Sequence, residues 1–215
     1  RVLFRSRDRA AAPRPVPRPA QLSVSGLVEL AADPDRARSR LTRRLPARPD
    51  PQALRGTAFH DWIQRFYGVD RLFDLADLPG AADADTAGAD AAALAVLQEA
   101  FRASAWAART PVAVEVPFEM VLGEVVVRGR IDAVFAEPDG GVTVVDWKTG
   151  APPDSPAAAR AAAVQLGVYR LAWAGLTGCA ESLVRTAFHY VRSGTTVAPE
   201  ALPARAELTA LTARI

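Results

Sequence analysis

The sequence predicts a mixed α/β (α+β) domain in which helices flank a central mixed sheet. Helical periodicity dominates residues 21–104, and three runs rich in β-branched residues follow between positions 112 and 149. An alanine-rich helical segment then leads to a fourth such run at 183–191. A helix between strand runs indicates a crossover connection within one sheet that is covered by helices.

The first two helices are predicted from their N-terminal caps. Ser23 precedes an apolar segment and is placed to cap a short helix through Leu30. Asp33-Pro34 fits an N-cap followed by proline at the first helical position, and this second pattern continues to about Arg44. Prolines at 46, 49 and 51 then interrupt regular structure.

Two longer helices complete the first half of the chain. Residues 53–67 predict one helix and residues 90–104 another, and the Gly/Ala/Asp-rich segment 78–90 between them reads as a loop. In the first of these helices, apolar side chains recur every four residues and are expected to share one face: Leu54, Ala58, Trp62 and Phe66.

Three antiparallel strands are expected next, over Val112–Val121, Val125–Ala136 and Val142–Thr149. Turn signals separate them at Leu122-Gly123 and at 138–141, where the sequence is Pro-Asp-Gly-Gly. Connections this short join antiparallel neighbours, because parallel strands need a longer crossover.

The rest of the chain supplies a helix, a strand and a closing helix. Ser155-Pro156 opens an alanine-rich helix that ends near Gly175. Leu183–Val191 reads as a further strand and 204–213 as a C-terminal helix. The long helix follows the third strand directly, so it is expected to cover the sheet.

The composition excludes several classes of protein. With 215 residues, half of them apolar, the chain can form one domain with its own core. Its apolar runs fall far short of the ~20 residues that a membrane span needs, and no secretory signal is visible. The single cysteine, Cys179, excludes an internal disulfide framework and a four-cysteine iron–sulfur cluster. These residues also contain no phosphate-binding loop of a nucleotide motor.

Positive charge is concentrated at the front of the chain. Thirteen of the 25 arginines lie within residues 1–55, which suits a phosphate backbone as partner, although a solvated linker and helix surface would look the same. Because the chain begins at Arg1, we expect a domain of a longer polypeptide. Residues 1–20 are basic and proline-rich and predict a linker; one domain follows over 21–215, with a helical lead-in at 21–104 and the sheet at 111–215.

Lys148 is the only lysine among 26 basic residues. In a chain that uses arginine so heavily, a retained lysine indicates a place where a compact ammonium is needed and a planar guanidinium fails. Chance survival on a surface strand is the alternative. Lys148 lies two residues after Asp146, on the strand before the crossover helix.

The middle strand of the three carries a polar stripe. Its even positions include Arg128, Arg130 and Asp132, and they are expected to lie on one face. Its odd positions are apolar and are expected to face the core: Val125, Val127, Ile131, Ala133 and Phe135.

Two aspartates are expected to face each other across the last hairpin. If residues 137–141 form its loop, Ala136 pairs with Val142, and Asp132 then lies opposite Asp146 with Cβ atoms about 4.5–5.5 Å apart. Two such carboxylates repel unless something offsets their charge, and a divalent cation with oxygen ligands would do so. The alternatives are a register shifted by one residue, or neutralisation by the nearby arginines.

Four further residues could join this site. His60 follows Gly56 by one helical turn; the glycine would allow a close approach, and a neutral imidazole binds metals, although a lone helical histidine is more often a packed residue. Gln165 and Tyr169 lie four apart on one face of the crossover helix, where an ordinary helix flank is the alternative. Glu115 is a further candidate, or an outward strand residue.

Taken together, these motifs resemble the RecB-like branch of the PD-(D/E)XK nuclease superfamily. The resemblance rests on His60, the Gly-Arg-Ile-Asp segment at 129–132, Asp-Trp-Lys at 146–148, and Gln165 with Tyr169, and it runs from about Leu22 to the C-terminus. The surrounding sequence resembles the C-terminal nuclease domain of actinobacterial UvrD-like helicase–nucleases of the AdnA/AdnB type. The resemblance implies a restriction-endonuclease-like core with an N-terminal helical extension.

The resemblance also implies site residues. Metal ligands would be His60, Asp132, Asp146 and the main-chain carbonyl of Trp147, with Glu115 as a tentative further ligand; the ion would be Mg²⁺ or Mn²⁺, without an iron–sulfur cluster. Lys148 would hold the attacking water, and Gln165 and Tyr169 would position that lysine or the strand being cut. Strand capture is assigned to arginines: Arg36, Arg38, Arg40, Arg43, Arg44, Arg128 and Arg130.

The function implied is metal-dependent hydrolysis of DNA, by exonuclease rather than endonuclease action, in double-strand-break processing and recombinational repair. Expected partners are single-stranded DNA ends, a helicase motor on the same polypeptide and a heterodimeric subunit, in the bacterial cytoplasm at the nucleoid and without a membrane. The rival is a catalytically silent module that binds DNA ends or a partner through the same fold. An RNA-cutting enzyme or a stand-alone repair nuclease is a second rival.

Overall fold

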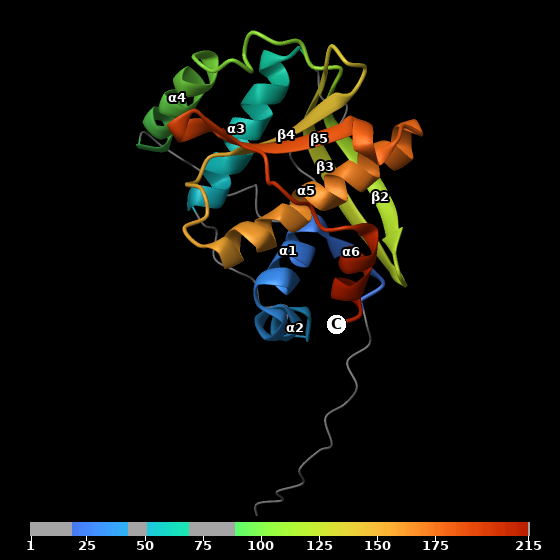
Figure 1. The fold of residues 1–215 in the computed structure, drawn as a ribbon. Coiled ribbons are helices and arrows are strands. Elements are labelled where there is room, and N and C mark those ends of the chain that lie inside the picture. The colour runs from blue at the N-terminus through green and yellow to red at the C-terminus, as the bar shows by residue number, and fades with distance from the viewer. Residues whose placement is uncertain (1–18, 43–50, 69–88, 215) are drawn as a thin grey trace, which may run out of the picture.

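The computed structural model describes residues 19–42, 51–68 and 89–214, drawn in colour in Figure 1. The expected linker lies almost wholly outside the described residues, as do most of the expected loop at 78–90 and the two arginines Arg43 and Arg44.

Both predicted caps at the start of the domain are confirmed. Helix α1 spans Val24–Ala32, and Ser23 Oγ accepts a hydrogen bond of 3.0 Å from the backbone N–H of Gly26. Helix α2 spans Pro34–Thr42, and Asp33 Oδ1 accepts one of 3.0 Å from Arg36 N–H. The side-chain oxygens thereby satisfy backbone donors that have no partner within the first turn.

Helices α3 (Pro51–Phe66) and α4 (Ala89–Arg102) form where the sequence predicts them, but the packed face of α3 differs from the expected one. Phe59 and Ile63 are fully buried, whereas Phe66 is 38% exposed. The expected stripe is confirmed in part: the Trp62 and Phe66 rings contact Phe101, but the fully buried side chains of α3 are Phe59 and Ile63, each one residue further along the helix.

The second half of the chain carries the long helix α5 (Pro156–Thr177), capped by Ser155, and the short C-terminal helix α6 (Arg205–Thr212). Helix α5 ends at Gly178, whose left-handed φ of 72° suits glycine. Short 3₁₀ turns, η3 (Glu181–Leu183) and η4 (Val191–Ser193), flank strand β5 (Val184–Tyr190). None of the described helices is long and apolar enough to cross a membrane.

The sheet is mixed, in the order β1-β3-β4-β5-β6, with β2 paired to β3 off this path. Strands β1 and β6 are three residues each and were not predicted, since so short a segment shows no alternation. The other four agree with the expected strands to within a residue or two. The six are β1 (Gln21–Ser23), β2 (Ala113–Leu122), β3 (Val125–Ala136), β4 (Val142–Lys148), β5 (Val184–Tyr190) and β6 (Thr195–Val197).

Strand β3 pairs with three other strands. One edge pairs antiparallel with β2 along most of its length. The other edge is shared: β1 pairs with residues 126–128, and β4 pairs with residues 133–136. The predicted register is confirmed, since Ala136 pairs with Val142, and continuing it past the last pair, Ala133 with Val145, brings Asp132 and Asp146 opposite each other.

Two cores lie on the two faces of the sheet. In Figure 1, α5 crosses in front of the sheet beside α1 and α6, and α3 and α4 lie together at the upper left. Neighbouring residues of β4 divide between these layers: Val144 belongs to the largely aliphatic core with α1, α5 and α6, and Val145 to the aromatic core with α3 and α4. The aromatic core is built around Phe59, Phe101, Phe135 and Trp147.

The alternation along β3 shifts by one residue at Asp132. Val127 and Ile131 belong to the aliphatic core, and the next β3 residue in that core is Val134, while Phe135 belongs to the aromatic core. The expectation that all odd positions share one core face is therefore wrong. The shift coincides with Glu115, which lies in line with Asp132 in the β2–β3 register and has a φ of 53°. A left-handed residue interrupts the regular alternation of a strand.

Candidate metal and catalytic site

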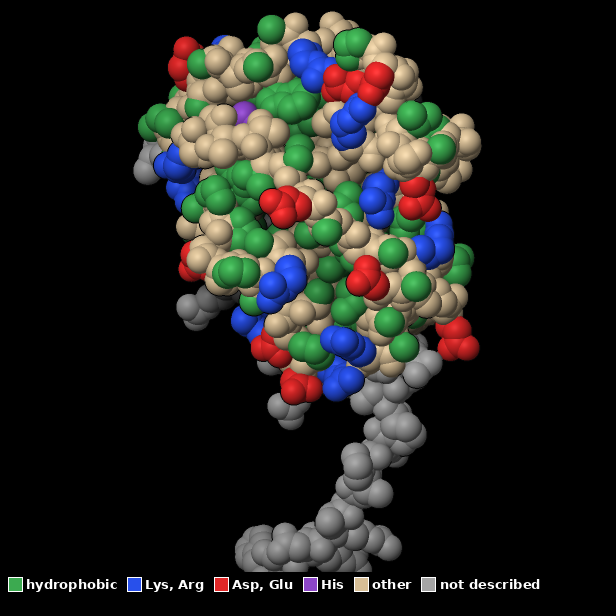
Figure 2. All heavy atoms as spheres, viewed as in Figure 1, with side chains coloured by type: hydrophobic (Ala, Val, Ile, Leu, Met, Phe, Trp, Pro, Cys, Tyr) green, Lys and Arg blue, Asp and Glu red, His purple; other side chains and the backbone are tan. Residues whose placement is uncertain are grey.

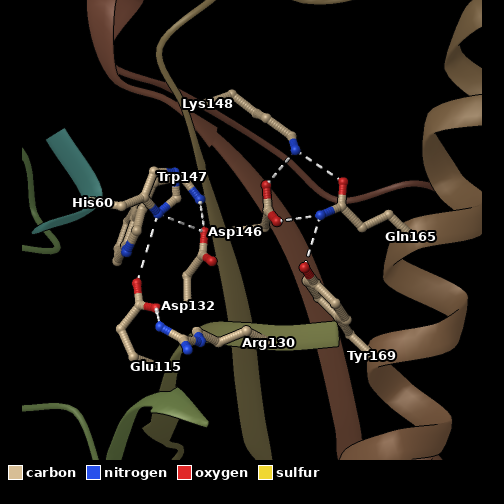
Figure 3. A network of polar contacts seen from close by, with 9 residues as sticks. All are labelled: His60, Glu115, Arg130, Asp132, Asp146, Trp147, Lys148, Gln165 and Tyr169. Atoms are coloured by element: carbon tan, nitrogen blue, oxygen red, sulfur yellow. Dashed lines mark hydrogen bonds and ion pairs between the residues drawn. The ribbon is translucent and has the colours of Figure 1, made fainter. Parts of the chain in front are cut away.

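Side chains from five elements converge where the two layers meet the sheet (Figure 3). Helix α3 contributes the imidazole, the three long strands contribute the carboxylates and the lysine, and α5 contributes an amide and a phenol. The residues are His60, Glu115, Asp132, Asp146, Lys148, Gln165 and Tyr169.

One half of the site is a compact group of possible metal ligands. His60 Nδ1 lies 3.5 Å from Asp132 Oδ2 and 3.7 Å from Glu115 Oε1. One ligand atom from each of the three residues lies within 4.8 Å of the others. A nitrogen and two carboxylate oxygens this close to one another form a donor set suited to Mn²⁺, and two carboxylates suit Mg²⁺.

Glu115 is held in an unusual way. It is the one non-glycine residue with positive φ in the described part of the chain, and its side chain is only 10% exposed. Arg130 Nη1 donates a hydrogen bond of 3.3 Å to Oε2, whereas the buried Oε1 has no hydrogen-bond partner. A buried carboxylate oxygen without a hydrogen bond is costly, and a bound cation would satisfy it. Glu115 is therefore no ordinary outward strand residue.

Asp132 is tied to the neighbouring strand by its side chain. The backbone N–H of Trp147 donates a hydrogen bond of 2.8 Å to Asp132 Oδ2, at the point where the β3–β4 pairs end. Burial raises the pKa of Asp132, the nearby carboxylate of Asp146 raises it further, and His60 opposes both. A carboxylate at this position is therefore disfavoured unless a positive charge lies beside it.

The carboxylates also act on His60. Burial lowers the pKa of its imidazole, but the attraction of Asp132, the contact with Glu115 and the field of Asp146 outweigh this and raise the pKa to about 9. A positive charge is thus stabilised at this position by three carboxylates. A divalent cation would meet the same attraction.

The other half of the site surrounds Lys148. Its Nζ lies 2.7 Å from Asp146 Oδ2 and donates a hydrogen bond of 2.8 Å to Gln165 Oε1. The amide nitrogen of Gln165 donates to Asp146 Oδ1 at 2.6 Å and to Tyr169 Oη at 2.8 Å. The helix spacing of four residues therefore places the amide and the phenol as predicted, and one amide joins the lysine, the aspartate and the tyrosine.

The network favours the charged lysine. Burial lowers the pKa of Lys148, but the ion pair and hydrogen bond with Asp146 more than offset this, so the pKa is raised. Burial also raises the pKa of Tyr169, as do the carboxylates of Asp146 and Asp132. At neutral pH this half of the site therefore presents an ammonium ion and a neutral phenol.

The predicted DNA-contacting arginines lie in several places. Arg130 contacts the site through its ion pair with Glu115. Arg128, on the same strand β3 as Arg130, pairs with Glu119 of β2 at 2.8 Å. On α2, Arg40 pairs with Glu29 at 2.7 Å, and Arg36 lines a shallow pocket beside it. On the face shown in Figure 2, basic and acidic side chains are interspersed, and the basic ones form no continuous band.

Sequence reasoning misjudged Gly56 and did not assign two contacts. A Cβ at Gly56 would meet Thr149 Oγ1 at 3.7 Å, an ordinary contact, so close packing does not require this glycine. The contact of Arg130 with Glu115 could have been sought from the β2–β3 register, which places the two residues two positions apart across the strands. The ring of Phe188 against Lys148 had no signal in residue spacing.

Comparison with known proteins identifies the family of this chain. Residues 21–213 match the family described as the PD-(D/E)XK nuclease superfamily. The chain belongs to this superfamily. Among solved structures, the PD-(D/E)XK chain is similar to one titled "Crystal structure of SSO0001", with 16% identity, a TM-score of 0.42, and coverage of 92% of this chain and 76% of the other. The comparison with curated proteins gave no match.

Members of the PD-(D/E)XK superfamily are typically metal-dependent nucleases, so membership indicates a nuclease that acts on DNA with a divalent ion. The donor set fits such an ion. His60, Glu115 and Asp132 are close enough to share it, and Glu115 Oε1 is a buried acceptor without a hydrogen-bond partner. The mixed sheet flanked by helices is consistent with the same superfamily.

Proposed function

We propose that this chain hydrolyses DNA phosphodiester bonds as an exonuclease on single-stranded ends, and that it is the nuclease domain of a helicase–nuclease that processes double-strand breaks. One observation supports the nuclease part: three side chains that could hold a metal ion lie in the same site as a lysine that is held by an aspartate and a glutamine. The assignment to a helicase–nuclease rests on the resemblance to the RecB-like branch and the AdnA/AdnB type.

The ion would be held by His60, Glu115 and Asp132, joined by Asp146 and the main-chain carbonyl of Trp147. A bound Mg²⁺ or Mn²⁺ supplies charge neutralisation at the phosphate and lowers the pKa of a water ligand. The chain contributes the arrangement of these donors. Asp132 accepts a hydrogen bond from the Trp147 N–H and Glu115 accepts one from Arg130, so both carboxylates are oriented by donor groups that do not themselves bind the ion.

Lys148 would orient the attacking water and stabilise negative charge that develops on the phosphate. The Lys148 side chain is 34% exposed, so its ammonium can contact a substrate while Asp146 and Gln165 hold it in place. Gln165 holds Lys148 and Asp146 at once, and Tyr169 fixes that amide from the other side. Gln165 and Tyr169 are thus proposed as positioning residues.

The test is cleavage of end-labelled single-stranded DNA with Mn²⁺, Mg²⁺ or EDTA, for the wild type and Asp146→Ala. Replacement of Glu200, an exposed carboxylate before α6, by alanine is the matched control. We expect metal-dependent cleavage that Asp146→Ala abolishes and Glu200→Ala preserves. Tight, salt-sensitive DNA binding without cleavage under any condition would contradict the proposal and favour the silent end-binding module.

Polarity and substrate choice are tested with the same material. Labels at the 5′ or the 3′ end distinguish progressive shortening from internal cuts. An exonuclease releases short products from one labelled end first, whereas an endonuclease produces internal fragments from both. Circular single-stranded DNA provides the decisive control, because only an endonuclease cuts it.

A further inference from the structure

An aromatic ring lies against the one lysine of the chain. Lys148 Nζ is 5.1 Å from the centroid of the Phe188 ring. Phe188 pairs with Asp146 in the parallel β4–β5 register, two residues before Lys148 reaches Tyr190. Phe188, Asp146 and Lys148 therefore share one face of the sheet.

This contact meets the conditions for a cation–π interaction. A ring face attracts a cation within about 6 Å of its centroid, and the attraction is stronger where water is excluded. Phe188 is 3% exposed and packs in the aliphatic core, with the Tyr190 ring centroid 6.2 Å away. An aliphatic side chain could fill the same core, but it would offer no negative face to the ammonium.

The ring adds a third contact to the ammonium of a side chain that is partly exposed. Asp146 and Gln165 contact Nζ with oxygen atoms at 2.7 and 2.8 Å, and Phe188 adds a third contact from a neighbouring strand. A lysine side chain has four rotatable carbon–carbon bonds, so two polar contacts alone leave it considerable freedom. A third contact restricts where the ammonium can move.

We propose that Phe188 is a positioning residue of the nuclease, whose ring face holds the Lys148 ammonium in the place where it acts on the scissile phosphate. The proposal rests on the proposed nuclease function of Lys148. It assigns to Phe188 a role that depends on the electrons of its ring and not only on its volume.

The first test uses the single lysine as a probe. Lysine labelled with ¹³C and ¹⁵N gives one set of side-chain signals in this protein, all from Lys148. A ring face shifts nearby protons upfield, so we expect upfield Lys148 Hε signals in the wild type that move toward ordinary values in Phe188→Leu. Unshifted wild-type signals would overturn the proposal, whether or not the protein cleaves DNA.

The second test changes the ring electrons at nearly constant shape. Fluorinated phenylalanines with one, two or three fluorines at position 188 weaken the negative ring face step by step. We expect kcat for metal-dependent cleavage to fall stepwise by about three- to tenfold in total, with KM and the unfolding midpoint unchanged. The matched control is the same series at Phe101, which is fully buried in the aromatic core.

The outcomes separate the two proposals. An equal kcat across the Phe188 series in an active enzyme would overturn the role of the ring and leave the nuclease intact. An equal fall in the Phe101 series would overturn it as well, because the effect would then come from packing. A wild type that never cleaves would contradict the proposed function, and the lysine signals would still decide whether the ring holds the ammonium.

Discussion

Arg130 donates a hydrogen bond to Oε2 of Glu115, and the opposite oxygen, Oε1, is left facing His60 without a hydrogen-bond partner. Such a carboxylate has one oxygen fixed and one available. Arg130 thereby orients the carboxylate through Oε2, so that only Oε1 is placed to bind a metal ion.

Arg130→Gln should therefore weaken metal binding. We expect an increase of about tenfold in the Kd for Mn²⁺, because the glutamate loses the contact that orients it. Titration calorimetry without DNA measures this directly. Arg128→Gln is the matched control: it removes the same charge from the same strand, and both arginine side chains are about half exposed, at 51% and 50%. Equal effects of the two changes would show that only overall charge matters.

Lys148→Arg should be nearly as damaging as Lys148→Ala. A guanidinium is planar and bulkier than an ammonium, and it cannot occupy the space between Asp146, Gln165 and the ring of Phe188 in the same way. We expect both variants to lose about a hundredfold or more in kcat for cleavage. Wild-type-like cleavage by Lys148→Arg would mean that positive charge alone suffices at this position.

His189 should make the fold sensitive to acid. It is 1% exposed, its Nδ1 lies 2.9 Å from Thr196 Oγ1, and burial lowers its pKa. The unfolded chain takes up a proton at His189 near pH 6.5 while the folded one resists it, so the contribution of His189 to stability falls as pH falls below 6.5. Going from pH 7.5 to 5.5, the unfolding free energy measured in urea should change less favourably for the wild type than for His189→Phe. Equal changes would exclude an effect of His189.

Replacing either of two glycines by alanine should change the stability of the fold, in opposite directions. A Cβ at Gly129 would lie 2.5 Å from Val24 Cγ2 and 2.7 Å from the Phe118 ring, so Gly129→Ala should destabilise the fold by about 1–3 kcal/mol. Gly56→Ala meets no such contact in helix α3 and should stabilise it by about 0.5–1 kcal/mol. Denaturant unfolding measures both. Destabilisation by Gly56→Ala would mean that this glycine has a packing role after all.

Much of the fold was predictable because the relevant signals are local. Caps at Ser23, Asp33 and Ser155 are set by residues within one turn. The β3–β4 register follows from the length of one hairpin loop, and it led directly to the two facing aspartates. Lys148 lies two residues after Asp146, so the two-residue period of a strand predicted that both side chains lie on the same face.

The remaining features depend on contacts between distant segments. The shift of alternation at Asp132 accompanies a left-handed Glu115, and glutamate carries no sequence signal for that conformation. Helix α3 buries Phe59 most deeply because that ring also packs against Phe101 of α4, a contact between segments far apart in the sequence. The ring of Phe188 reaches Lys148 only through a parallel pairing across the crossover helix, which no short motif encodes.

The division of the site between two layers has a consequence for how the protein becomes active. His60 is carried by a helix over the aromatic core, and Gln165 by a helix over the aliphatic core, while the carboxylates lie on the strands between them. A state in which only α3 or only α5 has packed on the sheet therefore lacks part of the site. In refolding, metal binding should therefore require the docking of α3 but not of α5, whereas cleavage should return only after both helices have docked.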